Sequence, residues 1–260
     1  DWVDSFSDID EGKSIVKLAI FGDSRTDDSE YMNWPDYTKK YLDGVAGIRV
    51  HDIYNYAVSG QSISQQKVLC TPENIANANV VVIDIGTNDI QIMTNEDTFA
   101  TDLETMIDVC LTAKKRVIIG VPDLFYTKGQ AGSRGQGSVN YDRHKGIRAK
   151  CMSIAAKKGV YFIDKGQILG PILAQYVNPS IQESYVSLGL DPILYDNIHP
   201  TTYGRMILGR EYAKSIMAVL MEKIDYATVD KLDLKANLES PSFTGSVVVP
   251  NAVNANQVPT

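Results

Sequence analysis

The sequence has few cysteines and histidines, and this scarcity excludes several kinds of site. The chain of 260 residues contains three cysteines and three histidines. Three scattered thiols are too few for a disulfide framework, and no pair of them has the spacing of zinc ligands. We therefore expect no metal site and three reduced, buried thiols, which are Cys70, Cys110 and Cys151.

Long apolar runs and an excess of basic residues are also missing. No apolar run approaches the roughly 20 residues that cross a bilayer, so we expect no membrane insertion. Lysine and arginine number 25 against 32 aspartate and glutamate, which gives a formal net charge of -7. Such a surface repels phosphate groups, and no basic face is clustered in the sequence, so nucleic acid is not an expected partner.

Five apolar runs separated by helical patterns predict an α/β fold. Most of these runs are nearly continuous in aliphatic residues, as expected of strands that are covered on both faces. Helical periodicity is clear at residues 97–114, 141–158 and 201–224. Strands alternating with helices favour a doubly wound domain with a parallel sheet over residues 13–225. The predicted strands are Ile15–Phe21, Ile53–Val58, Val80–Ile85, Arg116–Val121 and Val160–Ile163.

The composition changes outside this domain. Residues 1–12 are interpreted as a lead-in, and residues 226–260 as an extension that does not fold alone. The segment 234–260 is rich in Pro, Ser, Asn and Thr, and cannot bury enough apolar surface to form its own core. Within the domain, Lys128–Gly137 is rich in glycine and forms either a loop beside the site or a spacer without a role.

Polar turns that contain glycine follow the first three predicted strands. Gly22–Ser24 follows the first strand, Ser59–Gln61 the second and Gly86–Asp89 the third. Ligands of an open parallel sheet bind outside the carboxyl ends of its strands, so we expect these turns to meet at one edge. The segment Asp196–Pro200 precedes the last predicted helix and can close the same edge.

These residues suit acyl transfer to a serine. The hydroxyl of Ser24 needs a base, and the imidazole of His199 can serve near pH 7. Asp196, three residues earlier, can fix the tautomer of the histidine and stabilise the imidazolium. The candidate donors to the oxyanion are the backbone N–H groups of Ser24 and Gly60 and the side-chain amide of Asn88.

The four segments together resemble the sequence blocks of SGNH (GDSL-type) hydrolases. They stand in the order and spacing of that family, between residues 16 and 220. The resemblance implies a flavodoxin-like three-layer α/β/α sandwich with a five-stranded parallel sheet, no cofactor, and ester hydrolysis through an acyl-serine. It also implies that Gly22, Asp23 and Gly86 support the site, and that Asp89 holds the loop presenting Asn88.

One position departs from the pattern of the family. Arg25 stands where leucine often follows the serine, which places a cation beside the nucleophile. The arginine either contacts a hydroxyl or carboxylate of the substrate or forms a salt bridge with Asp27 or Asp28. The salt bridge is the more ordinary role for such a charge.

The extension resembles the short repeat of bacteriophage tail fibres and tailspikes. This resemblance rests on Leu234–Gly245 and Val248–Pro250. Such segments wind around copies from sister chains, which implies a homotrimer in the intact protein. It also implies a virion protein that is assembled in the host cytoplasm and acts at the bacterial cell surface. The predicted function is removal of O-acetyl groups from a surface polysaccharide, either capsule or O-antigen.

Two other classes of function remain open. A lipid-directed esterase, such as a lysophospholipase, would need an apolar acyl channel and would prefer octanoyl to acetyl esters. A receptor-binding module would bind glycan without catalysis, and its Ser24→Ala variant would behave like the wild type. A lyase or glycosidase would need paired carboxylates across a groove, and the sequence marks no such pair.

Overall fold

A parallel sheet of five strands forms the centre of the fold. The computed structural model describes residues 9–10, 13–28, 32–45, 48–92, 94–122, 137–169 and 199–221. The parallel strands run in the order β3-β2-β4-β5-β6, and β1 pairs antiparallel with the start of β2. This is the flavodoxin-like order, as predicted. The strands are β1 Ile9–Asp10, β2 Lys13–Gly22, β3 Ile48–Asn55, β4 Val80–Asp84, β5 Arg116–Val121 and β6 Tyr161–Asp164.

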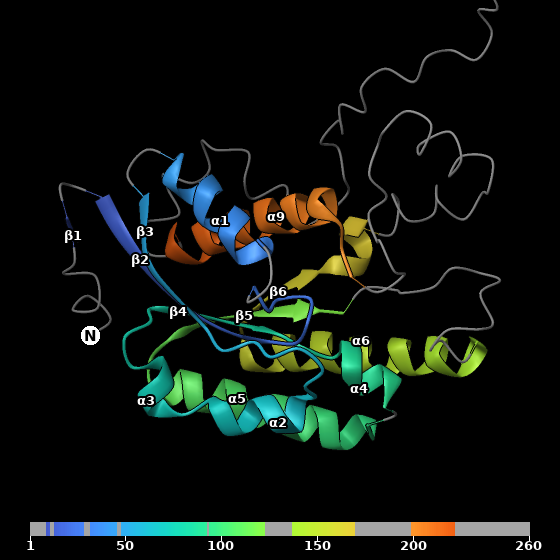
Figure 1. The fold of residues 1–260 in the computed structure, drawn as a ribbon. Coiled ribbons are helices and arrows are strands. Elements are labelled where there is room, and N and C mark those ends of the chain that lie inside the picture. The colour runs from blue at the N-terminus through green and yellow to red at the C-terminus, as the bar shows by residue number, and fades with distance from the viewer. Residues whose placement is uncertain are drawn as a thin grey trace, which may run out of the picture. The chain divides into compact units, whose positions relative to one another are not determined.

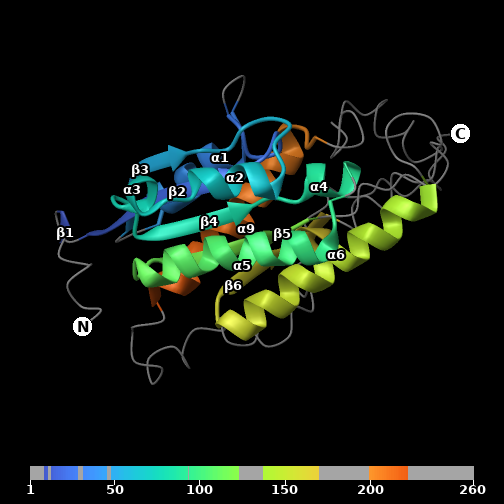
Figure 2. The same cartoon turned by 90° about the horizontal axis from the view of Figure 1, so that it is seen from below.

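Helices cover both faces of the sheet and complete the three layers. Figure 1 shows α1 and α9 on one face, and α2, α3, α5 and α6 on the other. The second group faces the viewer in Figure 2. The helices are α1 Trp34–Asp43, α2 Ile63–Leu69, α3 Pro72–Ile75, α4 Thr87–Gln91, α5 Glu96–Thr112, α6 Gly137–Lys158 and α9 Thr202–Met221. None of these described helices combines the length and the apolar character that a membrane span needs.

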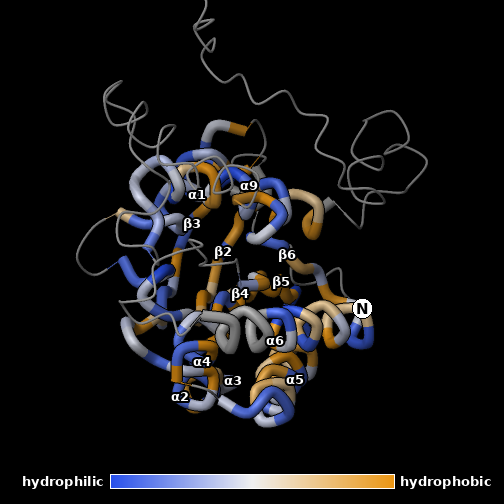
Figure 3. The backbone as a smooth tube through the Cα atoms, turned by 90° about the vertical axis from the view of Figure 1, so that its right-hand side faces the viewer, coloured by the Kyte–Doolittle hydropathy of each residue, from blue (hydrophilic) through white to orange (hydrophobic). Residues whose placement is uncertain are grey.

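Successive residues of the central strands fill the two interfaces alternately. On β2, Ala19 and Phe21 belong to the core shared with α2, α5 and α6. Leu18 and Ile20 point to the opposite face and are also completely buried. Every residue of β4 is buried, which explains the run of aliphatic residues from Val80 to Ile83. In Figure 3 the hydrophobic colour of β2 and β5 lies between the helical layers.

On the face of α1 and α9, an aromatic pair joins the two helices. The rings of Trp34 and Tyr212 stack with centroids 3.7 Å apart. Helix α1 begins at Trp34 because the side chain of Asn33 accepts its N–H and Asp36 accepts the N–H of Asn33. Such capping stabilises a helix start by about 1 kcal/mol. The sequence prediction missed α1, although this capping signal is present in it.

Two predicted elements are placed differently by the structure. The second strand was predicted at Ile53–Val58, but β3 covers Ile48–Asn55. It is an edge strand with most residues partly exposed, so it lacks the continuous apolar run of the central strands. The sequence of the last helix predicts a buried stripe of Met206, Ile207, Ile216, Val219 and Leu220. Ile216 and Val219 are buried as predicted, but Met206 is 38% exposed. Leu208, Tyr212 and Ala213 are further buried hydrophobic residues of α9 that the prediction missed.

Other predictions either agree with the structure or lie outside the described residues. The three cysteines are free and buried, as expected. Gly159, directly after α6, has a φ of 65°, the left-handed conformation that is common for a glycine ending a helix. Residues 128–136 of the glycine-rich segment, the extension 226–260 and most of the lead-in lie outside the described residues.

Candidate active site

Ser24 and His199 form a hydrogen-bonded pair at the carboxyl edge of the sheet. Nε2 of His199 lies 2.8 Å from Oγ of Ser24, although 175 positions separate the two residues. Ser24 follows the end of β2, and His199 precedes the start of α9. At this distance the imidazole can take the proton of the hydroxyl when the serine attacks a substrate. The structure thus brings together the predicted nucleophile and its predicted base.

Asp23 holds the turn that carries Ser24. Its carbonyl accepts the N–H of Thr26 at 2.9 Å, which closes the turn. Its carboxylate accepts the backbone N–H of Arg25 at 3.0 Å and that of Thr87 at 3.2 Å. Burial raises the pKa of this carboxyl, because the side chain has lost its contact with water. These hydrogen bonds link the first turn to the third, and the supporting role of Asp23 in catalysis stays a prediction.

A chain of buried polar groups lies directly beneath this turn. Oγ1 of Thr26 donates to Oδ2 of Asp84 at 3.0 Å and accepts the indole N–H of Trp34 at 3.1 Å. The other oxygen of Asp84 accepts a hydrogen bond from Nζ of Lys165. All four side chains are buried. The sequence prediction missed this chain, although Asp84 interrupts an otherwise apolar strand and so marks a special position.

Gly22 ends β2 at a place where no side chain fits. A Cβ there would lie 2.7 Å from Cβ of Thr26 and 2.9 Å from the carbonyl oxygen of Asp84. Both distances are below van der Waals contact, so a larger residue would displace the turn that carries Ser24. This close packing is the physical reason for a glycine in the first block.

The second turn, which carries Gly60, is bonded to the first. The N–H of Ser59 donates to Oδ2 of Asp27 at 3.0 Å, and that of Val58 donates to the carbonyl of Gly22 at 3.2 Å. Gly60 has a φ of 82°, a conformation that glycine adopts without strain. It is exposed, with no heavy atom within 4 Å of the place where a Cβ would be. A substrate can therefore approach its backbone closely.

The third turn presents Asn88. Nδ2 of Asn88 donates to the carbonyl oxygen of Gln61 at 3.0 Å, which fixes the orientation of the amide. The nitrogen carries two hydrogens, so it can also donate to an oxyanion. Gly86, at the start of this turn, has a φ of 125°, and a Cβ on it would lie 2.7 Å from Cγ of Pro122.

The side chain of Asp89 hydrogen-bonds the start of α2 and the segment that follows Asn88. Its Oδ2 accepts the N–H of Ile63 at 3.0 Å, and its Oδ1 accepts the hydroxyl of Thr94 at 2.9 Å. Burial raises the pKa of Asp89 to about 6, although these two hydrogen bonds favour the charged form. The side chain does not face solvent, so it holds the turn and is not a group that meets the substrate.

Arg25 is buried, and the structure decides neither of the two roles considered for it. It is 1% exposed, and its charge lies close enough to Asp23 to lower the pKa of that carboxyl against the larger effect of burial. Contact between Arg25 and a substrate would require the atoms that cover it to move, and it stays a prediction. Asp196 lies outside the described residues, so its place beside His199 also stays a prediction.

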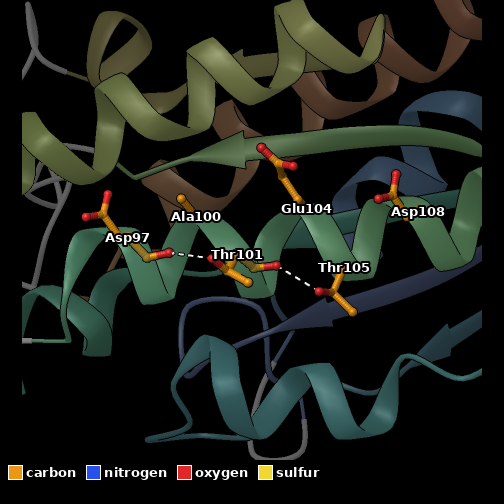
Figure 4. Close-up of a pocket in the computed structure, with 6 residues that line it drawn as sticks. All are labelled: Asp97, Ala100, Thr101, Glu104, Thr105 and Asp108. Atoms are coloured by element: carbon orange, nitrogen blue, oxygen red, sulfur yellow. Dashed lines mark hydrogen bonds between the residues drawn. The ribbon is translucent and has the colours of Figure 1, made fainter.

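A surface hollow on α5 is a separate feature. Figure 4 shows that all the side chains lining it belong to this one helix. Two of its threonines donate to carbonyl groups one turn earlier in α5. Its carboxylates pair with lysines of α6, so the hollow is part of an ion-paired seam between two helices. Among the described residues, no three His, Cys, Asp or Glu side chains are grouped as metal ligands.

Comparisons with known proteins agree with the geometry of the site. Comparison with curated protein sequences finds no match. Among solved structures, a catalytic mutant of Axe2, an acetylxylan esterase from Geobacillus stearothermophilus, is similar with a TM-score of 0.60 and 19% identity, over 77% of this chain and 94% of that one. The lipase/acylhydrolase from Enterococcus faecalis is similar with a TM-score of 0.56 and 24% identity, over 78% of this chain and 96% of that one. At these identities the likeness shows a common fold.

The sequence match to a family is more specific than this likeness of fold. Residues 20–206 match the model of the GDSL-like lipase/acylhydrolase family. The match covers more than half of the chain and includes the Ser24 turn, the turns of Gly60 and Asn88, and His199. This chain therefore belongs to the GDSL-like lipase/acylhydrolase family.

Proposed function

We propose that the chain is a serine esterase that removes O-acetyl groups from bacterial surface polysaccharide, such as capsule or O-antigen. The hydrogen bond between Ser24 and His199 carries the esterase part of this proposal. The substrate class is supported by the likeness in fold to Axe2, which is described as an acetylxylan esterase. It is supported further by the character of the surface around the nucleophile.

In the part of the chain that the structure describes, the turns around the nucleophile are mostly polar, with Val58 as an exposed apolar side chain among them. Ser59 and Gly60 are exposed, and Gln61 and Asn88 are partly exposed. These groups can hydrogen-bond sugar hydroxyls, and they offer little apolar area to a long acyl chain. A short acyl group on a hydrophilic alcohol is the substrate that such surroundings favour.

The first half of the reaction transfers the acetyl group to the enzyme. Oγ of Ser24 attacks the carbonyl carbon of the ester while Nε2 of His199 takes its proton. The electron pair of the carbonyl moves to its oxygen, and the resulting oxyanion accepts hydrogen bonds from the N–H groups of Ser24 and Gly60 and from Asn88. The intermediate then collapses, His199 protonates the departing sugar oxygen, and acetyl-Ser24 remains.

The second half releases acetate. A water molecule attacks the acetyl carbonyl while His199 takes one of its protons, and the same donors stabilise the second oxyanion. Collapse of this intermediate breaks the bond to Oγ of Ser24, and His199 returns the proton to the serine. The side chains of the site are thereby restored without any other reactant.

The proposal extends to the setting in which the enzyme works. The similarity of Leu234–Gly245 and Val248–Pro250 to tail-fibre repeats supports a bacteriophage tailspike. The chain would then be a homotrimer on the virion, held together through residues 226–260, and would meet the glycan at the surface of the host cell. These residues lie outside those that the structure describes, so this setting rests on their sequence alone.

The test is release of acetate from O-acetylated capsule and O-antigen preparations. Wild type should release acetate, and Ser24→Ala should lose activity by a factor of about 10⁶. Ser153→Ala, on the exposed side of α6, controls for handling and should match wild type. Turnover of octanoyl but not acetyl esters would point to the lipid esterase instead. Glycan binding without any turnover would point to the receptor-binding module.

A further inference from the structure

Gln66 lies on α2, and its buried side-chain amide forms hydrogen bonds with the turns of the active site. Its Oε1 accepts the backbone N–H of Gly22 at 3.0 Å. Its Nε2 donates to the carbonyl of Tyr56 at 3.1 Å and to Oε1 of Gln61 at 2.7 Å. The residue is 0% exposed. Both hydrogens of the amide nitrogen are therefore used, and no substrate can reach the side chain.

These bonds connect the segments that hold the three candidate donors to the oxyanion. Gly22 begins the turn of Ser24, and the bonds to Tyr56 and Gln61 reach both sides of Gly60. The connection continues to the third turn, because the carbonyl of Gln61 accepts Nδ2 of Asn88 at 3.0 Å. A single side chain thus lies between three turns that come from different parts of the sequence.

Helix α2 is itself fixed to the third turn at its start. The N–H of Ile63, its first residue, donates to Asp89 at 3.0 Å. Gln66 follows one turn later, so its backbone has little freedom to shift relative to Asn88. The side chain of Gln66 is therefore fixed in two ways, at its backbone by α2 and at its amide by the groups that it binds.

No other residue type supplies the same contacts. Glutamate would keep the acceptor for Gly22 but lose the two N–H donors. Methionine would fill the space but leave three polar groups, of buried Gly22 and of partly buried Tyr56 and Gln61, without this partner. Donors to an oxyanion act because they are already in place when the charge develops, so their relative position determines the rate.

We propose that Gln66 is a positioning residue that sets the relative placement of the oxyanion donors on the three turns. It acts through Gly22 and Gln61 and does not touch the substrate. The inference rests on the proposed esterase function and identifies a residue on which its transition state depends.

The first experiment compares Gln66→Met with wild type on an aryl acetate. Displacement of a catalytic group by about 1 Å can cost about 100-fold, so we expect kcat to fall about 10- to 100-fold. KM should change by less than about threefold, because the ground-state ester makes few of the affected contacts. Ser64→Ala is the matched control on the same helix, because the hydroxyl of Ser64 donates to Asp102 of α5 and makes no side-chain hydrogen bond to the described residues of the three turns. It should retain wild-type kcat.

A double-variant cycle with Asn88→Ala separates positioning from general loss of structure. In the Asn88→Ala background one of the oxyanion donors is already missing, so Gln66→Met can displace fewer donors. The further loss of kcat that it causes should therefore be less than about threefold. An equal loss in both backgrounds would overturn the proposal. So would an unchanged kcat in the single variant.

A second reaction keeps the test independent of the natural substrate. In labelling by a fluorophosphonate, Oγ of Ser24 bonds to phosphorus, fluoride leaves and His199 takes the proton. If wild type labels but hydrolyses no acetyl ester, the proposed function fails while the labelling rate still tests Gln66. If Gln66→Met does not fold, Gln61→Ala removes one partner of the amide at a partly exposed position. Its labelling should slow about three- to tenfold, and an unchanged rate would contradict the proposal.

Discussion

Asp84 and Lys165 form an ion pair in the interior, directly beneath the turn that carries Ser24. Asp84 is 1% exposed and Lys165 is 2% exposed. Moving two charges out of water is costly, and the pair persists only because each charge has the other and Asp84 also accepts from Thr26. Removing one partner alone leaves a buried charge without compensation.

Lys165→Met should therefore destabilise the protein strongly. We expect the free energy of unfolding to fall by about 3–5 kcal/mol, measured by urea denaturation at pH 7. Adding Asp84→Asn should recover part of this loss, because the remaining charge is then removed as well. Lys158→Met, which breaks a surface pair with Asp108, is the control and should cost less than about 1 kcal/mol. If both lysine substitutions lower the free energy of unfolding by the same amount, the buried pair stabilises the protein no more than the surface pair does.

The hydroxyl of Thr26 should matter for catalysis although it is completely buried. It donates to Asp84 and accepts from Trp34, and it lies two residues after Ser24. Thr26→Val keeps the shape but removes both bonds, so the turn can shift, and we expect kcat to fall about tenfold with little change in KM. Thr26→Ser keeps the hydroxyl and should restore most of kcat. A loss of kcat in Thr26→Ser but not in Thr26→Val would assign the effect to packing of the methyl group.

Asp89 should make stability depend on pH with a definite sign. Its pKa is raised to about 6 by burial, against about 3.9 in an unfolded chain. Between these values the folded state binds the proton more tightly, so the contribution of Asp89 to stability is greatest below pH 4 and is lost as the pH rises to about 6. The loss is about 3 kcal/mol, because one pKa unit corresponds to about 1.4 kcal/mol.

Asp89→Asn removes this titration and tests the sign. The free energy of unfolding of the variant minus that of wild type should rise by about 3 kcal/mol between pH 4 and pH 7. Asp97→Asn is the opposite case, because the hydrogen bond from Lys150 lowers the pKa of Asp97, and the difference should then fall as the pH rises. A difference that stays constant for Asp89→Asn would contradict the raised pKa.

The parts of the fold that could be predicted from sequence are those fixed by local pattern. The predicted bounds of β5, Arg116–Val121, match the structure, because a buried central strand is an uninterrupted apolar run. The edge strand β3 was misplaced because its partly exposed residues blur that run. The face of α9 was misjudged because it depends on Tyr212 stacking on Trp34, a contact between distant positions.

The candidate site also contains residues that the sequence identifies and residues that only the structure reveals. Ser24, Gly60, Asn88 and His199 could be identified because each lies in a short block with recognisable spacing. The groups that hold these blocks together could not, since Gln66, Asp84 and Lys165 lie outside the four blocks and belong to no motif. Their roles follow from hydrogen bonds that form only when the chain folds.

Asp196 is the predicted carboxylate partner of His199, and a substitution can test this role. A carboxylate that binds Nδ1 of His199 would fix its tautomer so that Nε2 can accept the proton of Ser24. Asp196→Asn would favour the wrong tautomer, and we expect kcat to fall by a factor of about 10⁴ while the protein remains folded. Asp191→Asn, five positions earlier in the chain, is the matched control and should keep its activity. If Asp191→Asn is the variant that loses activity and Asp196→Asn is not, the histidine takes its carboxylate from a position that the family spacing does not predict.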